Sequence, residues 1–141
     1  MYDDILVPTG GDKSIETVLE HTLAVAAGRD TTAHILYVID DQAFLTLDDE
    51  MKADVLEDLR AEGNEAIREA ASRLENADIA VETQISQGQP AGEILSYVEE
   101  QGIDLVTMGT RADEFTTNML GSTAQSVVTD SPVPVMTINV S

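Results

Sequence analysis

A candidate phosphate-binding turn is the part of this sequence whose residue types could do chemistry. The apolar segment 103–108 runs into Gly109, and after a polar loop Gly121, Ser122 and Thr123 open a segment with helical spacing. Glycine lets the backbone come close to a ligand, and a helix N-terminus offers unpaired N–H groups and a positive dipole end to an anion. This strand–loop–helix unit therefore predicts a cradle for phosphate.

The elements that must position this cradle alternate along the chain. Apolar runs typical of buried strands occupy residues 5–8, 33–39, 80–85, 103–108 and 135–140. Apolar residues at helical spacing occupy residues 15–26, 51–74, 90–102 and 123–129. Strands and helices therefore alternate along the chain. This order predicts a single α/β domain over residues 1–141, with a parallel sheet and helices on both faces.

Local composition gives four further expectations. Residues 40–49 should form a loop, and Gly63 should weaken the long helix that contains it. The segment 80–85 is less apolar than the other strands and should lie near an edge of the sheet. In the last helix, Val128 should face inward together with Ala124 and Val127.

The sheet topology predicts where a ligand would bind. In open parallel sheets the ligand lies beyond the C-terminal ends of the strands, at the point where the strand order reverses. If the first and fourth strands are neighbours there, the crevice lies between residues 8–12 and residues 108–113.

Acidic residues dominate the charge of the chain. There are 27 Asp and Glu against 7 Lys and Arg, a formal net charge of -20, and the acids are spread along the whole sequence. Binding to nucleic acid needs clustered cations, which the sequence lacks. The excess of acids favours adaptation to a cytoplasm of very high salt, where charge repulsion is screened, and an acidic surface for a basic partner is the alternative.

The sequence lacks the residues and segments needed for disulfides, metal sites and membrane insertion. There is no cysteine, and His21 and His34 have no second ligand at useful spacing, so neither a disulfide nor a metal site is expected. No apolar run approaches about 20 residues, and no basic signal region begins the chain, so a cytoplasmic protein without a membrane partner is expected.

Six short motifs, in this order and at these spacings, resemble the universal stress protein family over essentially the whole chain. They occupy residues 2–9, 36–40, 88–90, 104–109, 120–122 and 132–135. The resemblance implies a doubly wound, Rossmann-like sheet of five parallel strands in the order 3-2-1-4-5. It also implies a stress-response or signalling role and a site for ATP or AMP with Mg²⁺. The residues that would form this site are Pro8, Thr9, Gly10, Val38, Met108, Gly109, Ala112, Gly121, Ser122 and Thr123.

The chain departs from the family's nucleotide motif at three places. Ala112 stands where ATP-binding members have the second glycine of G-x2-G-x9-G-(S/T), and eight residues instead of nine separate it from Gly121. Gly10 replaces the acidic residue that contacts the nucleoside. Two functions therefore stay open: a nucleotide-responsive module, and a dimeric adaptor that binds proteins and no nucleotide.

Catalysis is not expected, although slow ATP hydrolysis stays open. The segment 9–14 loosely resembles the pyrophosphate loop of adenylating enzymes, but Lys13 stands where that loop has an aspartate. A receiver domain is excluded, because the acidic and lysine positions that it needs are missing.

The end of the chain carries no charge. Residues 131–141 contain neither acid nor base, and an edge strand is normally protected by charges. The alternatives are an ordinary terminal strand covered by helices and a two-fold homodimer in which this strand pairs with its copy. The resemblance favours the dimer, because universal stress proteins often pair in this way. The expected interface residues are Val135, Met136, Thr137, Ile138, Asn139 and Val140.

Overall fold

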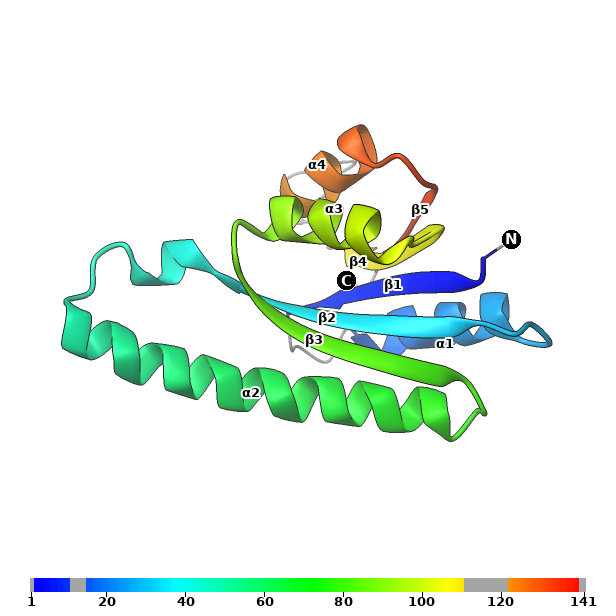
Figure 1. Cartoon of the computed structure of the whole chain (residues 1–141), viewed down its shortest axis with the longest axis horizontal. Helices are drawn as coiled ribbons and strands as arrows, with labels where there is room; N and C mark the ends of the chain where they lie inside the picture. Colours follow the sequence, from blue (N-terminus) through cyan, green and yellow to red (C-terminus); the bar gives the residue numbers. More distant parts are fainter. Residues whose placement is uncertain (1, 11–14, 111–121, 140–141) are drawn as a thin grey trace.

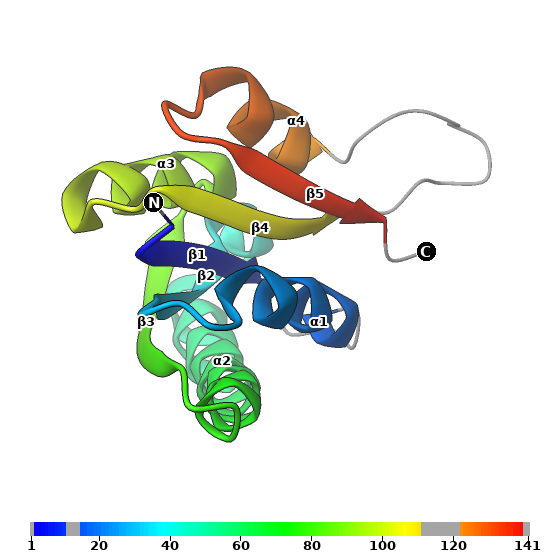
Figure 2. The same ribbon diagram turned by 90° about the vertical axis from the view of Figure 1, so that its right-hand side faces the viewer.

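A five-stranded parallel sheet forms the centre of the computed structural model, which describes residues 2–10, 15–110 and 122–139. The strand order is β3-β2-β1-β4-β5, so the predicted order 3-2-1-4-5 is confirmed (Figures 1 and 2). The strands are β1 (Asp4–Thr9), β2 (Thr32–Asp40), β3 (Ala80–Gly88), β4 (Leu105–Thr110) and β5 (Val135–Asn139).

Helices cover both faces of this sheet, because successive side chains of a strand point to opposite faces. The helices are α1 (Ile15–Ala26), α2 (Asp49–Glu75), α3 (Pro90–Gln101) and α4 (Ser122–Asp130). Ile5 and Val7 of β1 belong to a core shared with α1 and α2, whereas Leu6 belongs to a core shared with α3 and α4. Figure 2 shows the two pairs of helices on opposite sides of the strands.

The edges of the sheet are β3 and β5, as the polar composition of residues 80–85 predicted for β3. Helix α3 also begins and ends where the sequence indicates. Pro90 occupies its first turn, and Gly102 ends it with a left-handed backbone at φ 63°.

Two local expectations were wrong. Residues 40–49 are not only a loop, because Asp41–Phe44 form a 3₁₀ helix that Asp40 caps by accepting a hydrogen bond from the Gln42 backbone N–H. Val128 does not face inward but is 43% exposed. Val127 and Val128 are adjacent on a helix and point in different directions, so only Val127 reaches the sheet.

Gly63 does not interrupt its helix, because α2 runs continuously from Asp49 to Glu75, and the expected local weakness stays a prediction. Gly63 is buried against the ring of Tyr37 on β2, where an added Cβ would lie 2.7 Å from the Tyr37 Cδ1 atom. The glycine therefore lets the helix approach the sheet closely.

Candidate functional site

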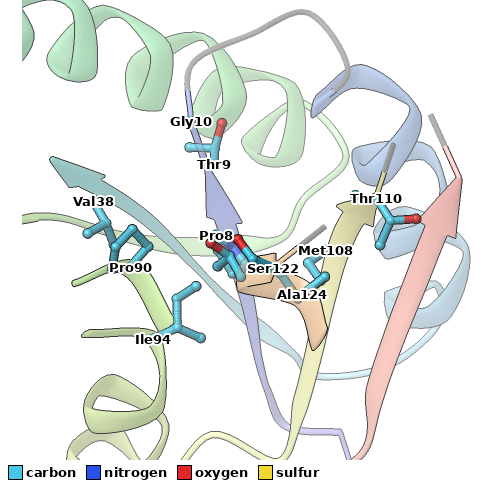
Figure 3. Close-up of a pocket in the computed structure, with 12 residues that line it drawn as sticks. Pro8, Thr9, Gly10, Val38, Pro90, Ile94, Met108, Thr110, Ser122 and Ala124 are labelled. Atoms are coloured by element: carbon cyan, nitrogen blue, oxygen red, sulfur yellow. The ribbon is translucent and has the colours of Figure 1, made fainter. Parts of the chain in front are cut away.

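β1 and β4 are neighbouring strands and form the switch point of the sheet. From β1 the chain crosses to β2 on one side, while β4 pairs with β1 on the other. A pocket of about 420 Å³ opens at this edge (Figure 3). Its lining residues are Pro8, Thr9, Gly10, Val38, Pro90, Ile94, Met108, Gly109, Thr110, Ser122, Thr123 and Ala124.

Most of the predicted nucleotide residues meet in this one pocket. Pro8, Thr9 and Gly10 come from the end of β1, and Met108 and Gly109 come from β4. Val38 of β2 and the first residues of α4, Ser122 and Thr123, complete the set. Ala112 and Gly121 lie outside the described residues, so the phosphate loop between β4 and α4 stays a prediction.

Three lining residues were missed, Pro90, Ile94 and Ala124, whereas Thr110 lies within the predicted crevice range 108–113 but was not named as a site residue. Pro90 and Ile94 belong to the first turns of α3, which follows the C-terminal end of β3 at the same edge of the sheet. The motif at residues 88–90 was a usable signal, because any segment that leaves this edge can reach the crevice. Thr110 directly follows Gly109, and Ala124 directly follows Thr123.

Both apolar and hydroxyl-bearing side chains line the pocket. Val38, Ile94 and Met108 supply side chains of the core shared with α3 and α4. Thr9, Thr110, Ser122 and Thr123 supply hydroxyl groups. Such a lining offers apolar surface to a flat ring and hydroxyl groups to an anion.

Two helices, α3 and α4, begin at the pocket. At the start of α3, the Gly92 backbone N–H donates to Oε1 of Gln89 at 2.6 Å, so part of that terminus is already satisfied. Helix α4 begins at Ser122, which is exposed and lines the pocket. The positive end of the α4 dipole therefore favours an anion beside Ser122 and Thr123.

None of the described lining residues carries a titratable side chain. A ligand in this part of the pocket would therefore contact hydroxyl groups, backbone and apolar side chains, and no acid or base that could transfer a proton.

The histidines lie away from the pocket. His21 is exposed on α1, whereas His34 on β2 is buried. Nδ1 of His34 lies 2.8 Å from the Tyr97 hydroxyl and 3.2 Å from Oε2 of Glu82, and Nε2 lies 2.9 Å from Oδ1 of Asp4. Burial, and then the charges of Glu82 and Asp4, raise the pKa of Tyr97. No group of three or more His, Cys, Asp or Glu in the described ranges could hold a metal ion.

The strand expected to form a dimer lies at the open edge of the sheet. β5 pairs with β4 on one side, and no other described strand pairs with its second side. Ile138 is buried and Asn139 is exposed, while Val140 lies outside the described residues. Within the described part of the chain, no helix is long and apolar enough to cross a membrane.

Comparisons with known proteins agree on one family. The family model described as "Universal stress protein family" matches residues 1–139. A universal stress protein of Methanothermobacter thermautotrophicus is 33% identical over 135 residues, which cover 94% of this chain and 92% of the relative.

Solved structures give the same fold. Protein MJ0577, which comes from Methanocaldococcus jannaschii, superposes with a TM-score of 0.86 at 26% identity and covers 99% of this chain and 96% of its own. A universal stress protein family protein from Arabidopsis thaliana with AMP bound superposes with a TM-score of 0.70 at 19% identity, over 98% of this chain and 92% of its own.

Proposed function

Because this chain belongs to the universal stress protein family, we propose that it is a nucleotide-responsive stress module whose pocket binds ATP or AMP. The observation that carries the proposal is the pocket at the ends of β1 and β4, whose lining includes apolar side chains and the first residues of α4. Its volume of about 420 Å³ is within the usual range for small-molecule sites. The plant protein with AMP bound has the same fold, so the fold accommodates such a ligand.

The chemistry of the lining residues supports a place for each part of the nucleotide. The adenine ring packs against Val38, Ile94 and Met108, and the phosphates lie at the hydroxyls of Ser122 and Thr123 and the N-terminus of α4. With ATP, Mg²⁺ would be held mainly by the phosphate oxygens, because the described lining residues offer hydroxyl oxygens and no carboxylate.

The role that we propose is binding and not catalysis. The described lining residues hold no titratable group that could activate water, which supports a binding role. The high negative charge supports a place in a cytoplasm of high salt, where it is screened.

Calorimetric titration of ATP, ADP and AMP with Mg²⁺, in about 3 M KCl to screen the charge, tests the proposal. We expect binding with one site per chain and a dissociation constant in the micromolar range, about -8 kcal/mol. Purified protein should also carry nucleotide if binding is tight. Absence of heat for all three ligands would remove the nucleotide function.

A dimeric adaptor is the second candidate function. Gly10 and Ala112 depart from the nucleotide motif, and β5 offers an uncharged edge for pairing with a second copy. This candidate becomes the working function if nucleotides fail to bind and the chain is a dimer. The homodimer through β5 is compatible with either function.

A further inference from the structure

A groove of about 600 Å³ lies between the start of α2 and the 3₁₀ helix Asp41–Phe44, and we call it the α2 groove. Its lining residues are Asp41, Phe44, Leu45, Asp49, Lys52, Ala53, Leu56 and Gln87. In the described part of the chain it shares no lining residue with the nucleotide pocket. The α2 groove is therefore a separate feature of the surface.

The part of the molecule that carries this groove projects from the sheet. Helix α2 has 27 residues and is about 40 Å long, whereas the longest strands have nine residues and span about 30 Å. The first turns of α2 and the 3₁₀ helix lie beyond the ends of the strands, at the left of Figure 1. A large partner can therefore reach the groove.

Exposed apolar side chains gather at this projection. Among the large apolar side chains that the structure describes, Leu45, Met51 and Val128 are exposed, at 75%, 52% and 43%. Leu45 lines the α2 groove together with Phe44 and Leu56, and Met51 belongs to the first turn of α2. Single exposed apolar residues are normal, but apolar surface that gathers at a hollow is typical of an interaction site.

Acidic residues are concentrated around these apolar side chains. Five of the eleven residues 40–50 are acidic, against 27 of 141 in the whole chain, and all five are exposed. They are Asp40, Asp41, Asp48, Asp49 and Glu50. Lys52 is the only cation among the lining residues that the structure describes. The α2 groove therefore combines apolar surface with a local excess of negative charge.

This combination decides which kind of occupant fits. A bare cation gains nothing from exposed leucine and methionine, so the occupant must also offer apolar side chains. A second copy of this chain has a net charge of -20 and few basic residues to place against the acids. Membrane surfaces are mostly negative, so the acids also repel a lipid surface. A protein segment with both apolar and basic side chains satisfies both requirements.

We propose that the α2 groove binds a segment of another protein in which apolar side chains are flanked by lysine or arginine. The apolar side chains of this segment contact Leu45, Met51 and Leu56. Its cations pair with Asp41 and Asp49. The proposal does not depend on nucleotide binding.

Titration of two labelled peptides against the full chain, followed by fluorescence anisotropy, tests this site. Both peptides are amphipathic helices of about 15 residues with the same leucine positions. The polar positions are lysine in one peptide and glutamate in the other. In about 1 M KCl the Debye length is about 3 Å, so diffuse attraction is suppressed. We expect one lysine peptide per chain and binding of the glutamate peptide that is weaker by about tenfold or more.

A pair of apolar variants locates the binding of the lysine peptide. Leu45→Gln/Met51→Gln removes exposed apolar side chains at the groove, and the control Val128→Gln removes one on α4. We expect the first variant to weaken binding about tenfold or more and the control to weaken it less than about twofold. Circular dichroism verifies that each variant is folded.

A pair of charge variants tests the role of the acids. Asp41→Asn/Asp49→Asn removes two charges from the groove, and the control Asp58→Asn/Glu75→Gln removes two from exposed positions farther along α2. We expect the groove pair to weaken binding several-fold and the control pair to weaken it less than about twofold.

These patterns together support the proposal. Equal losses in the two charge pairs would overturn it, because the attraction would then be diffuse. Failure of the lysine peptide to bind, equal binding of both peptides, or unchanged affinity in Leu45→Gln/Met51→Gln would also overturn it. A lower mass by light scattering for this variant than for the wild type would show instead that a second copy covers the groove.

Discussion

Gly63 shows at the scale of one residue how tertiary contact overrides local propensity. A glycine inside a helix normally costs about 1 kcal/mol relative to alanine, so the sequence indicates a weak point. The structure places Gly63 where a Cβ would lie 2.7 Å from Cδ1 and 2.9 Å from Cε1 of Tyr37. No sequence pattern reveals that contact, because it joins α2 to β2.

We expect Gly63→Ala to destabilise the protein. Overpacking against the ring costs about 1–3 kcal/mol and exceeds the helix gain of about 1 kcal/mol. The measurement is the free energy of unfolding from urea titration, and the control is Asn64→Ala, an exposed change at the next position. An increase in stability for Gly63→Ala would show that the helix can move away from the ring without cost.

Tyr97 gives a pH dependence that follows from its surroundings. Its hydroxyl pairs with Nδ1 of the buried His34, and its pKa is raised by burial, then by Glu82 and Asp4. The folded state therefore favours the neutral phenol. The contribution of Tyr97 to stability is complete below the unfolded pKa of about 10 and is lost as the pH rises through the folded pKa.

Tyr97→Phe should lower the free energy of unfolding by about 1 kcal/mol at neutral pH, because a buried hydrogen bond is lost. Above about pH 10, the unperturbed pKa of tyrosine, the stability of this variant should fall less steeply than that of the wild type. Urea unfolding at several pH values measures both effects. Parallel curves for the two proteins would contradict the role given to the Tyr97 hydroxyl.

At the scale of elements, the sequence identified the parts of the site that lie in one strand–loop–helix unit. Met108, Gly109, Ser122 and Thr123 were found because glycine and hydroxyl residues follow an apolar run. Ile94 was not found, because its apolar spacing in α3 indicates only a core position. Its place in the pocket depends on where α3 crosses the sheet, and that is a property of the fold.

The orientation of β5 allows a sharp test of the proposed dimer. The Val106 backbone N–H donates to the carbonyl oxygen of Pro134, so residue 134 and every second residue after it face β4. Thr137 therefore directs its backbone N–H toward the open edge. Thr137→Pro removes this donor and leaves the pairing of β4 with β5 in place.

Light scattering at micromolar concentration in high salt should give twice the chain mass of 15.1 kDa for the wild type. Thr137→Pro should give the monomer mass, whereas Thr137→Val, which keeps the N–H, should stay dimeric. A monomeric wild type would remove the dimer, and a dimeric Thr137→Pro would place the interface elsewhere.

At the scale of the whole molecule, charge sets the conditions in which the fold is stable. A net charge of -20 on 141 residues repels itself at low salt. The Debye length falls from about 10 Å at 0.1 M salt to about 3 Å at 1 M, so added KCl removes most of this repulsion.

We therefore expect the thermal midpoint from circular dichroism to rise between about 0.1 M and about 3 M KCl. Sucrose, which favours the compact state without screening charge, should reproduce only part of the rise. Identical melting curves at the two salt concentrations would remove the interpretation that the acids are an adaptation to salt.

The central claim is that the pocket at the ends of β1 and β4 binds an adenine nucleotide, with its phosphates at the start of α4. The most direct measurement is calorimetric titration of ATP with Mg²⁺ into the wild type, Ser122→Glu and Gln125→Glu. Ser122 lines the pocket, whereas Gln125 is exposed on the same helix and does not.

Both substitutions add one negative charge to α4, and an acid in the first helical turn does not harm the fold. Ser122→Glu should weaken ATP binding about tenfold or more, and Gln125→Glu should stay within about twofold of the wild type. Equal affinities in all three proteins, or no binding to the wild type, would contradict the claim.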